Sequence, residues 1–186
     1  MIRAFVAVNL APVISEEIAK IQFALKAAQG DIRWVRIEGL HLTLKFLGDI
    51  TREQVAPILT ALREALHDRS PFPVWAQGLG AFPNVQRPKV LWAGLLGDDL
   101  KEVQAAVETA LVPLDFPRDE RAFTPHLTLG RVRSLRGWPR VLAEFKRYEQ
   151  VRFGESEIDR VTLYQSDLRP EGAVYTVLGT VPLLQA

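Results

Sequence analysis

The feature that most constrains this chain is a four-residue motif that occurs twice. His41-Leu42-Thr43-Leu44 in the first half of the chain reappears as His126-Leu127-Thr128-Leu129 in the second half. The chain has 3 histidines, and two of them begin these motifs. A role in packing gives no reason to repeat histidine and threonine in alternation with leucine. The repeat therefore indicates two similar lobes, each of which contributes one strand to a shared site.

The alternation within each motif is typical of a β-strand, in which residues i and i+2 lie on the same face. His41 and Thr43 then share one face of the first strand, and His126 and Thr128 share one face of the second. The opposite face of the first strand is expected to point into a core: Leu40, Leu42, Leu44 and Phe46. Two such strands, placed face to face, would bring two imidazoles and two hydroxyls together.

This set of side chains suits the cleavage of a phosphodiester. Histidine has an unperturbed pKa of about 6.5, so one imidazole can accept a proton near neutrality while the other donates one. Threonine hydroxyls can hold the non-bridging oxygens of a phosphate and stabilise charge that develops in the transition state. No metal is required for this chemistry. A single histidine on its own is more often structural, and we interpret His67 as a surface residue.

The periodicity of apolar residues predicts an α/β or α+β protein. Helices are expected at about 14–28, with Ser15 as N-cap, at 51–66, at 98–111 and at 139–148. The second of these opens with Thr51-Arg52-Glu53-Gln54, a capping-box pattern. Short β-like runs lie between the helices: 2–9, 40–47, 72–79, 89–95, 126–133, 151–164 and 173–181. No linker separates them, so residues 1–186 are expected to form a single two-lobed catalytic domain.

The composition is that of an ordinary globular protein, with 48% hydrophobic and 24% charged residues. No apolar run approaches the roughly 20 residues that a membrane helix needs. The absence of cysteine excludes a disulfide, a thiol nucleophile and a thiolate metal site, and it favours a cytoplasmic location. The net charge is +1, but Arg118–Arg147 holds eight basic residues against three acidic ones. A local basic patch of this kind can attract phosphate.

Other catalytic classes lack their characteristic residues. The chain has neither a P-loop nor a Gly-x-Gly-x-x-Gly sequence after a strand. The closest approach to a serine nucleophile motif, Gly154-Glu155-Ser156-Glu157-Ile158, lacks the final glycine. The two histidines have no partner at helical i+4 spacing and no acid on their own strand faces, so we expect no metal ligands and no cofactor.

With these motifs the sequence resembles the RNA 2′,3′-cyclic phosphodiesterases, also called 2′-5′ RNA ligases, of the two-histidine phosphoesterase superfamily. The mark of the superfamily is a pair of His-x-Thr/Ser-x motifs. The resemblance covers almost the whole chain and includes the following segments: Arg3–Val8, Trp34-Val35, Leu40–Gly48, Pro88–Gly94, Phe123–Arg131, Leu163–Ser166 and Gly172–Tyr175.

The resemblance implies a bilobal α+β fold, in which two antiparallel sheets are flanked by helices and the histidines lie in a central cleft. It implies hydrolysis of an RNA terminal 2′,3′-cyclic phosphate to a 2′-phosphate, with RNA as partner. His41 would donate a proton to the leaving 3′ oxygen and His126 would activate water. Thr43 and Thr128 would complete the catalytic set.

Lys45 and Arg131 are the two candidates for substrate binding. Strict alternation places Lys45 on the His41 face. The resemblance makes Arg131 a phosphate or nucleotide contact, although alternation from His126 turns it away unless Gly130 forms a bulge. Two other functions remain open. The chain could join tRNA-like halves as a 2′-5′ RNA ligase, or it could be a non-catalytic RNA-binding module. We expect a monomer.

Overall fold

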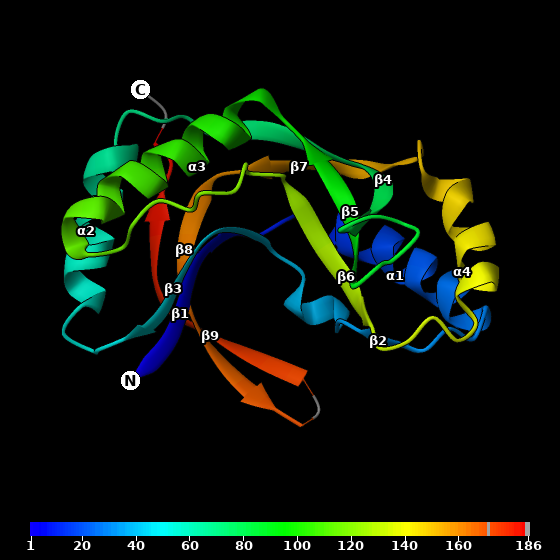
Figure 1. The fold of residues 1–186 in the computed structure, drawn as a ribbon. Helices are drawn as coiled ribbons and strands as arrows, with labels where there is room; N and C mark the ends of the chain where they lie inside the picture. The colour runs from blue at the N-terminus through cyan, green and yellow to red at the C-terminus, as the bar shows by residue number, and fades with distance from the viewer. Residues whose placement is uncertain (171, 185–186) are drawn as a thin grey trace.

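Two antiparallel β-sheets form the centre of the protein and give it the outline of an arch (Figure 1). The computed structural model describes residues 1–170 and 172–184, so three residues of the expected domain lie outside the description: Glu171, Gln185 and Ala186. The first sheet has the strand order β3 (Leu42–Ile50), β1 (Ile2–Val8), β8 (Arg160–Arg169), β9 (Gly172–Pro182). The second has the order β2 (Ile32–Trp34), β6 (His126–Val132), β5 (Val90–Leu96), β4 (Phe72–Phe82), β7 (Arg152–Ile158).

Each sheet has two helices on one face. Helices α2 (Val55–Leu66) and α3 (Asp98–Leu111) pack on the first sheet, and α1 (Pro12–Ala27) and α4 (Trp138–Phe145) pack at the second. Three short 3₁₀ helices complete the described elements: η1 (Ile37–Gly39), η2 (Val112–Leu114) and η3 (Lys146–Tyr148). We call the sheet face opposite the helices the open face.

The chain passes repeatedly between the two sheets. Strand β1 belongs to the first sheet, α1 and β2 lie at the second, and β3 returns to the first. Later, α3 leaves β5 to pack on the first sheet before the chain re-enters the second as β6. The two histidine motifs therefore lie in different sheets, as the repeat predicted. The fold class predicted from the sequence is confirmed.

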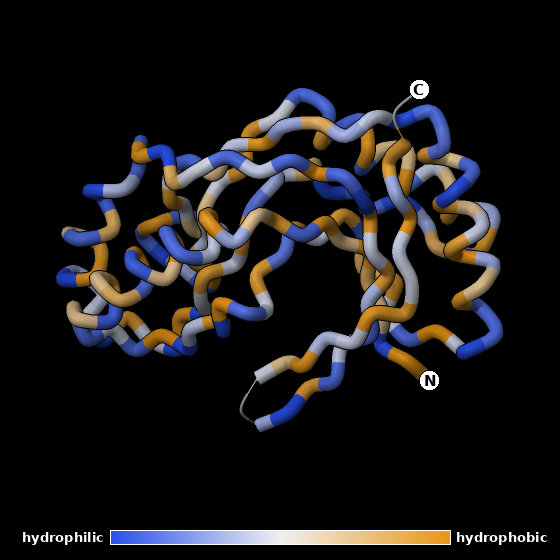
Figure 2. The backbone as a smooth tube through the Cα atoms, turned by 180° about the vertical axis from the view of Figure 1, so that it is seen from behind, coloured by the Kyte–Doolittle hydropathy of each residue, from blue (hydrophilic) through white to orange (hydrophobic). Residues whose placement is uncertain are grey.

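The core lies between the sheets and their helices. Alternate residues of the strands are buried there, and Leu127 and Leu129 of β6 are inaccessible to solvent. Burial of an aliphatic side chain of this size stabilises a fold by roughly 1.5–3 kcal/mol. The leucines of both motifs therefore anchor their strands, while the histidines and threonines face the other way. Figure 2 shows the arch from behind, with hydrophobic and hydrophilic turns alternating in the helices at both ends.

A β-bulge follows the first motif. Thr43 pairs with Ala7 of β1 and Lys45 pairs with Val6, so Leu44 is an extra residue in β3. The bulge reverses the alternation. Lys45 is consequently buried, at 6% exposure, whereas Phe46 is 68% exposed. The prediction that Phe46 points into the core is wrong for this reason.

The second motif carries a bulge at the equivalent position. Thr128 pairs with Trp92 of β5 and Gly130 pairs with Leu91, so Leu129 is the extra residue. Leu129 and Gly130 are both buried on the helix side, and Arg131 emerges on the open face with exposed side chain. The Arg131 assignment required a bulge, which was expected at Gly130 and lies one residue earlier, at Leu129.

Several element boundaries differ from the prediction. The run 151–164 divides at Asp159 into β7 and β8, and the three-residue strand β2 was not predicted. Helix α1 begins at Pro12 after the N-cap Ala11, so Ser15 lies inside the helix. Proline suits the first helical position because its missing N–H would have no partner there. The second helix begins at Val55 with Gln54 as its N-cap, and not at Thr51 as predicted. The Thr51 N–H donates to Gln54 Oε1 at 2.9 Å, a contact that lies in the turn before the helix.

Candidate active site

The two motif histidines are oriented by the same local hydrogen bond. Nδ1 of His41 lies 2.7 Å from the carbonyl oxygen of Gly39, and Nδ1 of His126 lies 2.6 Å from that of Thr124. A carbonyl oxygen only accepts, so each Nδ1 carries the proton and donates it. Each imidazole, when neutral, then has its basic lone pair on Nε2. The fold thus fixes the same tautomer at both histidines.

Aromatic rings surround His41. Its ring centroid lies 4.7 Å from that of Phe5 and 4.9 Å from that of Tyr175, whose ring meets it edge-on. Tyr164 lies beyond, at 6.4 Å. Burial among these rings lowers the pKa of His41 from its ordinary value of 6.5, although the hydrogen bond to Gly39 acts in the opposite direction. The free protein therefore favours a neutral His41 more than an exposed imidazole would.

His126 has a smaller aromatic environment on the second sheet. Phe82 meets its ring edge-on at a centroid distance of 5.0 Å, and Trp92 lies at 6.3 Å. The Trp92 indole in turn lies against the backbone of Gly80, where an added Cβ would come within 2.1 Å of the ring. Glycine at this position therefore leaves room for the Trp92 ring.

Thr43 and Thr128 share the open faces with the two histidines. Each is partly buried, between fully or nearly fully buried leucines. Within residues 1–170 and 172–184, neither hydroxyl has a protein hydrogen-bond partner. Both hydroxyls are therefore free to donate to a bound group, as the sequence analysis requires.

Lys45 does not belong to the open face, so the prediction that it shares a face with His41 is wrong. The bulge at Leu44 turns its side chain toward α3, where Nζ lies 2.5 Å from Glu108 Oε2 and 2.7 Å from the Pro117 carbonyl oxygen. Both side chains of this ion pair are more than nine-tenths buried. Glu108 also accepts from the Asp119 N–H at 3.3 Å. Lys45 therefore binds the segment that leads from α3 to β6.

Arg131 lies on the open face, as its assignment as a binding residue requires. Burial raises the pKa of Tyr175, and the charge of Arg131 acts in the opposite direction. Strands β3 and β6, which carry the two motifs, are in contact, and Tyr175 contacts His41. The rest of the basic segment divides: Arg140 donates to the Ala28 carbonyl at the end of α1, and Arg147 pairs with Glu144 on α4.

The aromatic residues of the site were not predicted from the sequence. Gly172–Tyr175 was part of the resemblance, but nothing in its pattern indicated that Tyr175 would contact His41. Phe5 and Trp92 read as ordinary strand residues, and only the pairing of β1 with β3 and of β5 with β6 brings them to the histidines. Strand pairing of this range is not visible in local periodicity.

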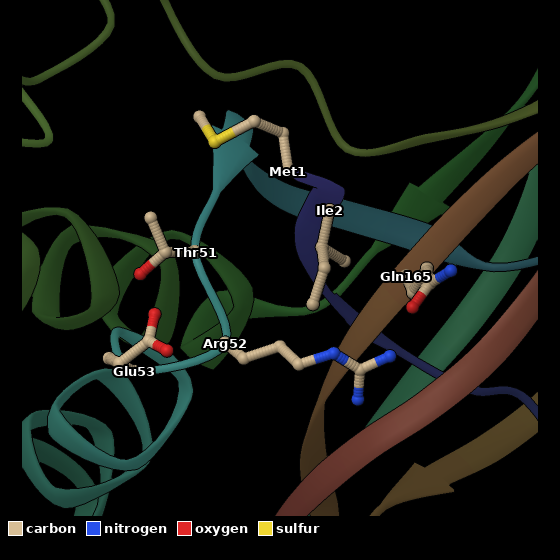
Figure 3. Close-up of a pocket in the computed structure, with 6 residues that line it drawn as sticks. All are labelled: Met1, Ile2, Thr51, Arg52, Glu53 and Gln165. Atoms are coloured by element: carbon tan, nitrogen blue, oxygen red, sulfur yellow. The ribbon is translucent and has the colours of Figure 1, made fainter.

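A separate hollow lies away from the histidines (Figure 3). Its lining comes from the N-terminus, the turn before α2 and β8: Met1, Ile2, Thr51, Arg52, Glu53 and Gln165. The Arg52 side chain extends across it toward Gln165. None of the predicted site residues lines this hollow.

Within the described part of the chain, no group of three or more His, Asp or Glu side chains is placed to hold a metal ion. Among those same residues, no helix combines the length and apolar character needed to cross a membrane.

Comparison with known proteins defines the class as a phosphoesterase. The sequence pattern of the LigT-like phosphoesterases matches residues 8–92 and 96–175. The chain belongs to the LigT-like phosphoesterase family, which confirms the resemblance drawn from the paired motifs.

Relatives and solved structures agree with this assignment. The chain is 33% identical to an RNA 2′,3′-cyclic phosphodiesterase of Methanothermobacter thermautotrophicus, over 94% of this chain and 95% of the relative. It is 37% identical to one of Archaeoglobus fulgidus, over 93% and 96%. The fold matches TT0787 of Thermus thermophilus with a TM-score of 0.82 at 28% identity, covering 97% of both chains. It matches E. coli LigT complexed with 3′-AMP with a TM-score of 0.75 at 24% identity, covering 99% of both.

Proposed function

We propose that this protein hydrolyses the terminal 2′,3′-cyclic phosphate of an RNA to a 2′-phosphate, by metal-independent acid–base catalysis with two histidines. The matched hydrogen bonds from Nδ1 of His41 and His126 carry the proposal, because they leave Nε2 of both histidines as the atom that can exchange a proton with a substrate. The substrate class is supported by relatives that are named RNA 2′,3′-cyclic phosphodiesterases. Their similarity extends over nearly the whole chain.

The reaction needs one proton acceptor and one proton donor. Water attacks the phosphorus atom on the side opposite the 3′ oxygen, and a neutral imidazole accepts the proton that the water loses. The bond between phosphorus and the 3′ oxygen breaks, and an imidazolium supplies the proton that this oxygen takes up. The product carries a 2′-phosphate and a free 3′ hydroxyl. Each histidine ends in the protonation state in which the other began.

We assign the donor to His41 and the base to His126. The buried environment of His41 disfavours its charged form in the free protein, so the donor role requires that substrate favour protonation. The negative charge of the cyclic phosphate has the necessary sign, because an anion beside an imidazole raises its pKa. Thr43 and Thr128 donate to the non-bridging oxygens and hold phosphorus in line between the two Nε2 atoms.

Product analysis tests this function directly. An oligoribonucleotide that ends in a 2′,3′-cyclic phosphate is incubated with the protein, and the product is separated from synthetic 2′-phosphate and 3′-phosphate standards. The proposal predicts the 2′-phosphate alone. Recovery of the 3′-phosphate would place the leaving group on the other oxygen, and recovery of unchanged substrate would contradict the proposed hydrolysis.

A further inference from the structure

Two arginines lie side by side on the open face of the second sheet. Arg33 of β2 is the direct partner of Arg131 of β6 in the antiparallel register. Directly paired residues have Cβ atoms about 4.5–5.5 Å apart and point to the same face. Like charges in this arrangement repel each other and destabilise a sheet. An anion bound to both guanidinium groups would offset this repulsion.

The face on which the pair lies follows from its neighbours. Ile32 and Trp34, on either side of Arg33, pack toward the core, and Lys26 of α1 lies over the Trp34 ring. Arg33 consequently points to the open face, which also bears His126, Thr128 and, after the bulge, Arg131. Both arginine side chains are exposed.

No carboxylate within residues 1–170 and 172–184 forms an ion pair with either arginine. Arg33 instead donates from Nη2 to the carbonyl oxygen of Pro170, at 3.2 Å, in the segment between β8 and β9. The nearest acids along β2 and β8 have other partners: Asp31 accepts from Ser134 Oγ, and Asp167 accepts from Gln165 Nε2. The guanidinium groups thus retain donors for an external anion.

The position of the pair relative to Thr128 defines which anion fits. Thr128 pairs with Trp92 and Arg131 with Val90, so the arginines lie two β5 residues, about 7 Å, further along the sheet. Arg33 lies one strand, about 4.8 Å, beyond Arg131. The displacement of about 7 Å between Thr128 and the arginines is similar in length to one nucleotide step of an extended single strand.

We propose that Arg33, together with Arg131, binds the phosphodiester that precedes the cyclic end of the RNA. This inference rests on the proposed function, and it makes an RNA chain, rather than a cyclic mononucleotide, the preferred substrate. Arg33 is a binding residue that holds the strand and takes no part in the proton transfers. Arginine suits this task because its planar guanidinium can present two N–H groups to one phosphate.

The test compares two substrates, a 2′,3′-cyclic mononucleotide and a dinucleotide that carries the same cyclic end. Arg33→Gln should lower kcat/KM for the dinucleotide about 10-fold and for the mononucleotide less than about 2-fold, as expected for an exposed charge-assisted hydrogen bond. The slope of log(kcat/KM) against log salt for the dinucleotide should become shallower by about 0.7, the loss of one single-strand phosphate contact. Arg33→Lys, which keeps the charge but not the planar pair of N–H groups, should retain the salt dependence and only part of the dinucleotide preference.

A substrate change provides the matching half of a double-mutant cycle. A dinucleotide whose linkage is an uncharged methylphosphonate should lose at least this factor with the wild-type protein, since it also lacks the charge that Arg131 binds, and Arg33→Gln should add little to that loss. As a control, Arg63→Gln removes an exposed arginine from α2. It should leave kcat/KM unchanged for both the mononucleotide and the dinucleotide. Equal effects of Arg33→Gln on both substrates would overturn the proposal and assign Arg33 to the support of the Pro170 segment.

A failure of the proposed hydrolysis can be distinguished from a failure of the phosphate site at Arg33. If the wild-type protein hydrolyses neither substrate, calorimetric titration with the dinucleotide 2′-phosphate still measures the contribution of Arg33. Weaker binding by Arg33→Gln, absent for the mononucleotide 2′-phosphate, would support the phosphate site in the absence of turnover. Identical affinities for both ligands would refute it.

Discussion

Phe46 and Arg131 occupy equivalent positions in the two lobes. Each lies five residues after its histidine, and each is turned to the open face by a bulge at the last leucine of its motif. The two lobes therefore present different side chains from the same structural position. The first sheet offers an exposed aromatic ring, 6.0 Å from the ring of Phe5, and the second offers a cation. The repeated framework thus supports an asymmetric binding surface.

Phe46→Ala should weaken the binding of an RNA end without changing its salt dependence. An exposed ring on the open face can stack on a base, and such stacking contributes roughly 1–3 kcal/mol per base. The measurement is KM for a cyclic-phosphate oligonucleotide at several salt concentrations. Phe23→Ala is the matched control, because Phe23 is also exposed, at 77%, but lies on α1. Equal KM values for Phe46→Ala and Phe23→Ala would show that Phe46 does not contact the RNA.

Lys45→Met should destabilise the fold by about 3–5 kcal/mol, because it leaves Glu108 buried without its cation. Lys45→Met combined with Glu108→Leu should recover most of that loss, since an apolar pair of similar volume can replace a buried ion pair. Urea unfolding of the wild-type protein and the two variants measures both effects.

The same variants test the correction to the assignment of Lys45. If Lys45 only holds the Pro117 segment, the double variant should keep its affinity for RNA. A double variant that is stable but binds RNA as weakly as a charge-deletion variant of the open face would return Lys45 to the binding surface.

The sequence predicted the strands that carry the two histidine motifs, but not where the alternation of buried and exposed residues in them breaks. Each motif alternates as an ideal strand would, so His41 and Thr43 were placed correctly and Lys45 and Phe46 were exchanged. A bulge inserts one residue relative to a partner strand, and β1 is the partner that decides this at Leu44. In β6 a glycine marked the equivalent position, since glycine within a strand often indicates a bulge. In β3 no such residue stands there, so only the pairing reveals the bulge.

Thr43→Val and Thr128→Val should each lower kcat by roughly 10²–10³, the usual loss of one donor to a developing charge. Valine keeps the shape and the β propensity, so the melting temperature should change little. Thr180→Val, at an exposed strand position in β9, should leave kcat unchanged. Unaltered kcat in both motif variants would make these hydroxyls structural.

Turnover of a cyclic-phosphate end should persist in excess EDTA, because the two imidazoles and two hydroxyls can supply the proton transfers and the charge stabilisation. The measurement is the initial rate before and after extended dialysis against the chelator. A lost rate that zinc or manganese restores would contradict a mechanism in which the histidines act without a metal.

The pH dependence of kcat/KM should be bell-shaped. Its alkaline limb should lie at a lower pH than it would if the proton donor were a solvent-exposed histidine. The protonated fraction of His41 falls as pH rises through a pKa that burial holds below 6.5, so the donor is lost early in the free protein. The limbs describe the coupled pair of histidines and not one residue each. The corresponding limb of kcat should lie at higher pH, because bound phosphate favours the imidazolium. Coincident alkaline limbs in the two profiles would show that substrate does not raise the pKa of the donor.

The most direct test of the two-histidine mechanism is the rescue of histidine variants by a substrate whose leaving group needs no proton. Replacing the bridging 3′ oxygen of the cyclic phosphate by sulfur gives a thiolate leaving group. The account predicts that this substrate largely restores kcat to His41→Ala, which lacks only the donor. His126→Ala should remain inactive, because it still lacks the base that activates water. Rescue of His126→Ala in place of His41→Ala would reverse the roles, and rescue of neither or both would contradict the division between donor and base.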